Sequence, residues 1–331
     1  MEHPRYNGSL YNEFILLGFP GFEGSEHLLS ALLLLVYLTT LIANLAIVLV
    51  IAPDPSMHHP MYLLICCLSV VDIIVSSAVV PKMLLSFLFD LKAVSLASCL
   101  AQMFLVHFWS SAESTLLLAM AVDRFVAICN PLRYAAIVTG TALLKLALFA
   151  LVRSGLTVTT LVILASPLPF CRTNLIAHCY CEHMALVRLA CADTSLNSTL
   201  GLVFAFAIIG FDSVCVLLSY WKIVTVVLKI SSADSRHKLF HTCCTHLLVI
   251  SFCYLTALFS FLAYRVGQVP MGIRVLLSVM YLILPPMANP IIYGMRTREI
   301  RERLLKRFRG RGIKVSIRID NKHCFALYRS C

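Results

Sequence analysis

Hydrophobic residues run through this chain in seven long segments separated by short polar stretches. Six of them cover about residues 28–51, 61–85, 97–122, 142–165, 201–228 and 239–263. The seventh covers residues 273–294 and contains three prolines. A helix of about 20 apolar residues crosses a bilayer core and satisfies its own backbone groups there. The pattern therefore predicts an all-α membrane protein, a seven-transmembrane-helix bundle over residues 28–294.

A different pattern follows the seventh segment. Over residues 295–309, the apolar side chains of Ile300, Leu304, Leu305 and Phe308 recur at helical spacing among Arg and Lys residues. A basic amphipathic helix of this kind lies on the inner leaflet and is attracted to anionic membrane lipids. Residues 1–27 and 310–331 are left as an extracellular N-terminal tail and a cytoplasmic C-terminal tail.

Composition and charge agree with a membrane protein. The 331 residues are 60% hydrophobic and 13% charged, whereas soluble domains carry about 25% charged residues. Of the net charge of +11, residues 296–331 contribute +9 from 12 basic and 3 acidic residues. The rest of the chain is nearly neutral. These values exclude a water-soluble protein of two domains and a generally basic nucleic-acid binder.

The loop charges predict the direction of insertion. Nineteen Lys and Arg residues fall on the side of the C-terminal tail and six on the other side. Because cytoplasmic loops carry the excess of basic residues, we expect a multi-pass plasma-membrane protein with its N-terminus outside. The sequons at Asn7 and Asn197 both lie on the predicted outer side, and Asn7, in the free tail, is the expected glycosylation site.

Five of the 14 cysteines lie on the predicted outer side: Cys99, Cys171, Cys179, Cys181 and Cys191. An oxidising exterior permits disulfides, and the odd number leaves one cysteine unpaired. A zinc site is the alternative for the cluster His178, Cys179, Cys181 and His183. Disulfides are favoured because extracellular thiols more often oxidise.

Several short motifs match a known pattern in order and spacing. They are Pro60-Met61-Tyr62, Leu68-Ser69 with Asp72, Met120 to Cys129, Pro131 to Tyr134, Ser219-Tyr220, Lys238 to Cys243 and Asn289 to Tyr293. Together they resemble the olfactory (odorant) receptor family of rhodopsin-like G-protein-coupled receptors, over about residues 10–308. The segment Phe14 to Glu23 is similar to the class I subgroup. Two positions depart from the family, which usually has Tyr where this chain has Val122 and Phe125.

The resemblance implies two disulfides and a ligand pocket. The implied disulfides are Cys99–Cys181 and Cys171–Cys191, which leave Cys179 as the spare thiol. The implied ligand-binding residues are Met103, His107, Ser110, Ser111, Phe204, Ile208, Tyr254, Leu258, Phe261 and Arg265. Arg265 would anchor a short acid because a guanidinium binds a carboxylate through two hydrogen bonds. The alternatives are a snorkelling charge at Arg265 and a packing role for His107.

The resemblance also implies switch residues. Those for G-protein coupling are Asp123, Arg124, Tyr220, Asn289, Pro290 and Tyr293. Asn44, Asp72 and Glu113 would form a polar network with Asn289 that holds a sodium ion or a proton. Intramembrane ionisable groups are expensive, so a functional role is the default interpretation. The alternative is a structural, hydrogen-bonded pair with one carboxyl group protonated, because two close buried carboxylates do not both ionise.

These observations predict an odorant receptor that binds a small odorant, including short acids, within the bundle and activates a stimulatory heterotrimeric G protein of the olfactory type. A receptor of the same family for metabolite acids outside the olfactory epithelium is the nearest alternative. A transporter is more remote, because the chain shows no internal repeat. An enzyme is not expected, since no hydrolase, metalloprotease or nucleotide-binding motif is present. We expect no cofactor or metal apart from sodium near Asp72 and Glu113, and no nucleic-acid partner.

Overall fold

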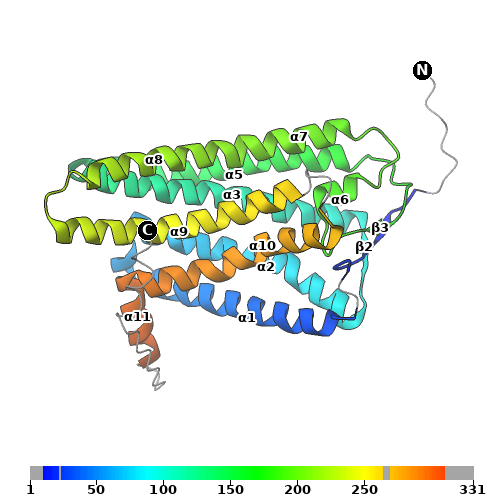
Figure 1. The fold of residues 1–331 in the computed structure, drawn as a ribbon, viewed down its shortest axis with the longest axis horizontal. Helices are drawn as coiled ribbons and strands as arrows, with labels where there is room; N and C mark the ends of the chain where they lie inside the picture. The colour runs from blue at the N-terminus through cyan, green and yellow to red at the C-terminus, as the bar shows by residue number, and fades with distance from the viewer. Residues whose placement is uncertain (1–9, 22–23, 264–268, 310–331) are drawn as a thin grey trace.

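The computed structural model describes residues 10–21, 24–263 and 269–309, and its long helices run side by side in one bundle (Figure 1). They are α1 (Glu26–Ile51), α2 (Pro60–Phe89), α3 (Leu96–Cys129), α5 (Gly140–Ala165), α7 (Ser195–Ala205) continued by the π-helix η3 (Phe206–Gly210) and α8 (Phe211–Val227), α9 (Ala233–Ala263) and α10 (Met271–Arg296). Six spans among the described residues are long and apolar enough to cross a membrane, and α3 with the bent segment Pro131–Ile137 makes a seventh. The predicted seven-helix bundle is therefore confirmed.

Local chemistry explains where several of these helices begin. Ser95 precedes α3, and its hydroxyl accepts a hydrogen bond from the amide of Ser98 at 3.2 Å. Thr139 does the same for the amide of Ala142 at the start of α5, at 3.1 Å. Side chains of this kind satisfy amides that a first helical turn leaves free. Pro60 starts α2, a position where its missing N–H costs nothing.

A small sheet closes one end of the bundle, which we call the sheet end. Strand β1 (Glu13–Leu16) pairs antiparallel with β2 (Ala93–Ser95) and parallel with β3 (Leu175–Ile176). Alternate residues of β1, Phe14 and Leu16, are fully buried against the loop that follows α5. The segment expected to be a plain N-terminal tail therefore contributes a strand to the cover of the bundle.

Helix α11 (Arg298–Arg309) lies at the opposite end, which we call the α11 end, and turns away from the bundle (Figure 1). Its Ile300 is fully buried, as the amphipathic pattern predicts. Arg303 forms an ion pair with Asp54, next to the short helix η1 (Pro55–Met57), and Arg307 donates to the carbonyl of Leu49 at 2.6 Å. Protein contacts thus hold this helix in addition to any lipid. The remaining short helices are η2 (Pro131–Arg133), α4 (Tyr134–Ile137) and α6 (His183–Val187).

Helix α10 continues through its prolines because a neighbouring helix supplies a missing donor. Pro290 has no N–H, so the carbonyl of Pro286 cannot make its bond to the residue four positions later. The Nδ2 of Asn44 on α1 donates to that carbonyl at 2.8 Å. Its second bond goes to the carbonyl of Thr40, also on α1. Asn44 therefore stabilises the junction of α1 and α10. Both hydrogen bonds of its amide nitrogen go to these carbonyls, and its place in a network with Asp72 and Glu113 stays a prediction.

Candidate ligand cavity and polar clusters

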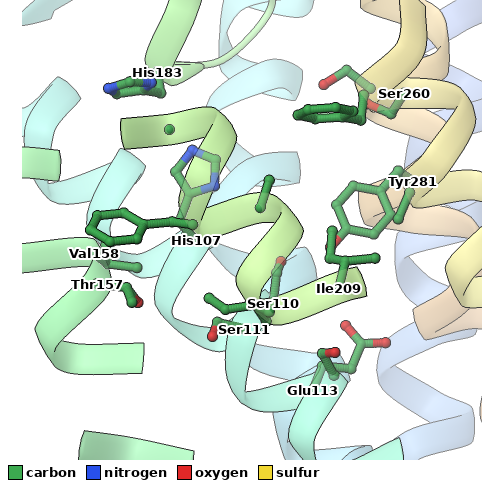
Figure 2. A pocket seen from close by; sticks show the side chains of 18 of the residues that line it. His107, Ser110, Ser111, Glu113, Thr157, Val158, His183, Ile209, Ser260 and Tyr281 are labelled. Atoms are coloured by element: carbon green, nitrogen blue, oxygen red, sulfur yellow. The ribbon is translucent and has the colours of Figure 1, made fainter. Parts of the chain in front are cut away.

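The bundle encloses a cavity of about 230 Å³ near the sheet end. Its walls come from α3, α5, α7–η3, α9 and α10, and the loop that carries α6 covers it. Figure 2 shows His183 at one end of the cavity and Glu113 at the other, with His107 between them. Drug-sized ligands usually occupy about 300–1,000 Å³, so this volume suits a smaller molecule.

Most of the residues expected from the sequence as ligand contacts line this cavity. They are His107, Ser110, Ser111, Phe204, Ile208, Tyr254 and Phe261. Ser114 lines the cavity as well. Two of the expected residues do not line it. Met103 is buried in a separate cluster with Ala165 and Val187, and Leu258 is 45% exposed and is not part of the cavity wall. Arg265 lies outside the described residues.

Other residues that line the cavity were not predicted from the sequence. Tyr180, Glu182 and His183 reach the cavity from the loop between α5 and α7, and Tyr281 reaches it from α10. The loop has no apolar periodicity that could reveal which of its side chains point inward. Tyr281 lies in an apolar helix, where spacing alone does not separate a bundle-facing from a lipid-facing position. Only the tertiary structure shows that these residues lie beside the cavity.

Two disulfides fix the covering loop. Cys99 at the start of α3 is bonded to Cys181, and Cys171 is bonded to Cys191 within the loop. These are the pairs that the resemblance implies. Cys179 is a free, buried thiol, and burial raises its pKa. Because Cys181 is in a disulfide, the four-ligand zinc alternative loses one of its ligands.

His178 is a buried neutral residue of the same loop. Its Nδ1 accepts hydrogen bonds from the amides of Cys179, at 3.0 Å, and Tyr180, at 3.3 Å. Burial lowers the pKa of His178 to about 3. A proton on Nδ1 would also break both amide bonds, because protonated Nδ1 is a donor only. The folded loop therefore favours the neutral imidazole.

A buried ion pair joins four helices beneath the cavity. Arg153 of α5 donates from Nη1 and Nη2 to the two carboxylate oxygens of Asp212 on α8, both at 2.8 Å. Nη2 also donates to Thr115 at 2.6 Å, and Ser114 donates to Asp212 at 2.7 Å. The Ser114 hydroxyl lies 3.1 Å from that of Tyr254 on α9. We call these five residues the ion-pair cluster. No functional role for Asp212 or Arg153 was predicted from the sequence.

A second buried group contains two carboxylic acids. The Nδ2 of Asn289 on α10 lies 3.3 and 3.2 Å from the two oxygens of Asp72 on α2. The Cys253 sulfur on α9 lies 3.8 Å from both Asn289 Oδ1 and Glu113 Oε1. We call these four residues the carboxylate cluster. Among the described residues, no Lys or Arg forms an ion pair with either acid.

The two clusters meet at the floor of the cavity. Glu113 and Ser114 are consecutive on α3, and Cys253 and Tyr254 are consecutive on α9. The pair Glu113–Cys253 belongs to the carboxylate cluster and the pair Ser114–Tyr254 to the ion-pair cluster. Both clusters therefore bridge the same two helices at the same level. All four residues line the cavity.

The α11 end holds four of the six residues expected for coupling, whereas Asn289 belongs to the carboxylate cluster and Pro290 follows it on α10. Arg124 Nε lies 3.8 Å from Asp123 Oδ2, and Asp123 also accepts a 2.6 Å hydrogen bond from the hydroxyl of Tyr134. Tyr293 lies 3.3 Å from His246 Nδ1, whereas the buried hydroxyl of Tyr220 has no hydrogen-bond partner among the described residues. In this structure neither tyrosine hydrogen-bonds to Arg124.

Three other sequence features have a place in the fold. Val122 is exposed on the outer face of α3, and Phe125 packs against the apolar core of the α11 end. The departures from Tyr therefore remove no hydroxyl from the cavity. Asn197 is buried and its amide nitrogen is inaccessible, so this sequon is closed to glycosylation in the folded chain. Asn7 lies outside the described residues.

Comparison with known proteins identifies similar chains. A family profile described as "Olfactory receptor" matches residues 33–311. Human olfactory receptor 52P1 is 43% identical over 320 residues, which cover 96% of this chain and 100% of that relative. Human olfactory receptors 52D1 and 52K2 are each 42% identical, and cover 90% and 88% of this chain and 94% and 93% of their own lengths.

Proposed function

This chain belongs to the olfactory receptor family, and from this premise we propose that it binds a small odorant in the cavity and activates a stimulatory heterotrimeric G protein. Its relatives are G-protein-coupled receptors, so the chain is a multi-pass membrane receptor and not an enzyme.

The observation that carries the proposal is the cavity itself. It is small, mostly apolar and enclosed by five spans, and it contains the polar side chains of His107, Ser110 and Ser260. Apolar walls with a few placed polar groups are typical of small-molecule sites. The Nε2 of His107 is buried without a hydrogen-bond partner among the described residues. A ligand that supplies this partner would be oriented by it.

The two contacts between α3 and α9 at the floor of the cavity offer a route for the signal. A ligand resting on this floor touches Ser114 and Tyr254 from one cluster and Glu113 and Cys253 from the other. A shift of α9 changes both contacts together. Binding that favours the shifted arrangement would move a pre-existing equilibrium toward it.

The sheet end would face the exterior and the α11 end the cytoplasm. Both disulfides lie at the sheet end, which suits an oxidising compartment. The basic helix α11 and Arg124 lie at the opposite end, where basic residues accumulate on the cytoplasmic side. In this orientation, movement of α9 would expose Arg124 to the G protein.

An acidic odorant would depend on one residue. Among the described lining residues there are two carboxylic acids, Glu113 and Glu182, and no Lys or Arg. A carboxylate ligand would therefore need Arg265 as its cation. We keep the short acids as part of the proposal on this condition, and substitution of Arg265 tests it directly.

The proposal is tested by a panel of odorants, including short acids, with cyclic AMP as the readout. Ala257 lines the cavity, so Ala257→Phe should abolish every response, whereas Leu258→Phe on the outward face of the same helix should preserve them. Arg124→Ala should remove signalling at normal surface expression, and Arg265→Ala should remove responses to acids only. A full response in Ala257→Phe would contradict binding in this cavity.

A further inference from the structure

Several contacts hold the covering loop in place over the cavity at the sheet end. The disulfide from Cys181 to Cys99 holds it on α3, and the hydroxyl of Tyr180 lies 2.6 Å from that of Ser278 on α10. His183 packs so closely on α7 that a Cβ at Gly201 would lie 3.3 Å from its ring. The loop is therefore held on three sides of the cavity, and the strand β1 covers it from outside.

The wall between α7–η3 and α9 is built differently. The cavity-lining side chains there include Ala205 on α7 and Ala257 on α9, which are too short to fill a space between helices. An edge-to-face pair bridges the two helices at this level: the rings of Phe206 and Phe261 lie 5.7 Å apart at 81°. Phe206 is 63% exposed on the outer surface, whereas Phe261 lines the cavity. At this point, the two rings in contact are what separates the outer surface from the cavity.

The backbone next to this pair is irregular. Residues Phe206–Gly210 form a π-helix within an otherwise α-helical span, and such single turns occur frequently at functional sites. Ile209 of this turn points into the cavity (Figure 2). In a π-helix each carbonyl bonds the amide five residues later, one residue more than in an α-helix. A change of this turn to α-helical hydrogen bonding would therefore rotate Phe206 and Ile209 relative to α9.

From these contacts we propose that small apolar ligands reach the cavity from the bilayer, between η3 and α9, when the rings of Phe206 and Phe261 part. Apolar molecules concentrate in the bilayer because transfer out of water is favourable, and Phe206 is exposed on the surface that lipid covers. The choice of an apolar ligand rests on the proposed function, whereas the entry path is inferred from the packing between η3 and α9. The loop then stays in place over the cavity, and ligands enter where the rings of Phe206 and Phe261 separate.

The experiment measures access without needing an agonist. A cysteine is placed in the cavity by Ala257→Cys, the receptor is reconstituted in phospholipid nanodiscs, and labelling of residue 257 is followed by mass spectrometry. The two probes are N-ethylmaleimide, which is uncharged and enters the bilayer, and a trimethylammonium methanethiosulfonate, which stays in water. Labelling of the native Cys253 is measured in the chain that keeps Ala257 and subtracted.

Phe206→Ala should raise the rate of labelling by N-ethylmaleimide roughly three- to tenfold, the range expected when one aromatic pair is lost from a barrier. The rate with the charged reagent should not change. Phe211→Ala is the matched control, because Phe211 lies on the same span, is 58% exposed and has no ring contact with Phe261 among the described residues. Phe206→Trp, which keeps the wall closed, should slow the uncharged reagent.

An unchanged rate in Phe206→Ala would overturn the proposal. Equal acceleration of both reagents would also overturn it, since the opening would then lead to water. An unchanged rate with the charged reagent in the Phe206→Ala chain shows that this variant is folded. If the labelling rates are as expected but no odorant raises cyclic AMP, only the proposed function is contradicted. The two failures are therefore distinguishable.

Discussion

The ion-pair cluster and the carboxylate cluster lie side by side under the same cavity and satisfy their charges in different ways. In the first, the carboxylate of Asp212 accepts two hydrogen bonds from the guanidinium of Arg153 and one from the hydroxyl of Ser114. In the second, the neutral partner of Asp72 is Asn289 and that of Glu113 is Cys253, and these two partners contact each other. One cluster is complete within the chain, and the other lacks a positive charge among the described residues.

This difference separates a fixed element from an adjustable one. A buried ion pair with good geometry resists rearrangement, because breaking it leaves an unpaired charge. Two neighbouring carboxylic acids without a cation need a proton or a bound ion, since both do not ionise together. We therefore expect the ion-pair cluster to hold α3, α5 and α8 in place and the carboxylate cluster to respond to its surroundings.

The largest expected effect comes from breaking the ion pair. Asp212→Ala leaves the guanidinium of Arg153 without its partner and should lower the free energy of unfolding by about 3–5 kcal/mol. The double variant Arg153→Met with Asp212→Leu should recover most of that loss, because no unpaired charge remains. Thermal unfolding of the purified receptor measures both.

The exposed pair Arg298–Glu302 on α11 gives a control for this experiment. Its side chains are 76% and 58% exposed, and the two charged atoms lie 2.7 Å apart. Glu302→Gln should cost less than about 1 kcal/mol, since exposed ion pairs contribute little. Additive losses from Arg153→Met and Asp212→Leu would show that the buried pair is not a unit.

The next effect is a loss of stability at low pH caused by His178. It must be measured before any acid sensitivity is assigned to the carboxylate cluster. The unfolded imidazole of His178 binds a proton below its ordinary pKa of about 6.5, whereas the folded one, with a pKa of about 3, does not. Between these values the unfolded chain binds more protons, so stability falls as the pH falls. From pH 7 to pH 5 the loss should be about 2 kcal/mol.

The variant His178→Asn isolates this contribution. The amide oxygen of Asn can accept the bonds that Nδ1 accepts from the amides of Cys179 and Tyr180, and it does not titrate. The difference in unfolding temperature between pH 7 and pH 5 should shrink in this variant. An unchanged difference would place the acid sensitivity elsewhere, with the carboxylate cluster as the first candidate.

Sodium should stabilise the carboxylate cluster to a smaller extent. An ion that binds only the folded protein adds about 1.4 kcal/mol when it is present at ten times its dissociation constant. Unfolding temperature is compared in sodium chloride and in choline chloride at equal ionic strength. Asp72→Asn and Glu113→Gln should each remove the difference. Glu182→Gln, which also lines the cavity but lies outside the cluster, should keep it. A sodium effect that survives Asp72→Asn would make this cluster a purely structural group.

The two clusters also differ in how far the sequence could predict them. Asp72, Glu113 and Asn289 lie in motifs that resemble the family, and the structure brings all three into one cluster. Asp212 and Arg153 lie in no such motif, and a charge within an apolar segment does not reveal which helix carries its partner. Their pairing depends on the rotation of α5 and α8 about their axes, which short-range patterns do not determine.

The fold shows the same division between pattern and long-range contact. Seven apolar segments were sufficient to predict the seven spans, because each span satisfies its own backbone. The strand β1 could not be predicted, since its partners β2 and β3 lie about 80 and 160 residues away. Met103 and Leu258 lie outside the cavity wall for a related reason: helical spacing groups residues on a face but leaves a position at its edge ambiguous.

The smallest effects should come from the two contacts that join α3 and α9 at the cavity floor, and here the clusters can be compared directly. Ser114→Ala removes a hydroxyl that bonds Asp212 at 2.7 Å and lies 3.1 Å from Tyr254. A hydrogen bond contributes about 1 kcal/mol, so agonist-free cyclic AMP should change by up to about fivefold if this bond holds α9 in its present position. Cys253→Ala removes only 3.8 Å thiol contacts and should change agonist-free cyclic AMP less.

Tyr254→Phe should add little to the effect of Ser114→Ala, because both remove the same contact. Ser110→Ala, elsewhere in the cavity wall, should leave agonist-free signalling unchanged. Full additivity of the first pair would mean that the ion-pair cluster ends at Asp212 and that α9 is held by the carboxylate cluster alone.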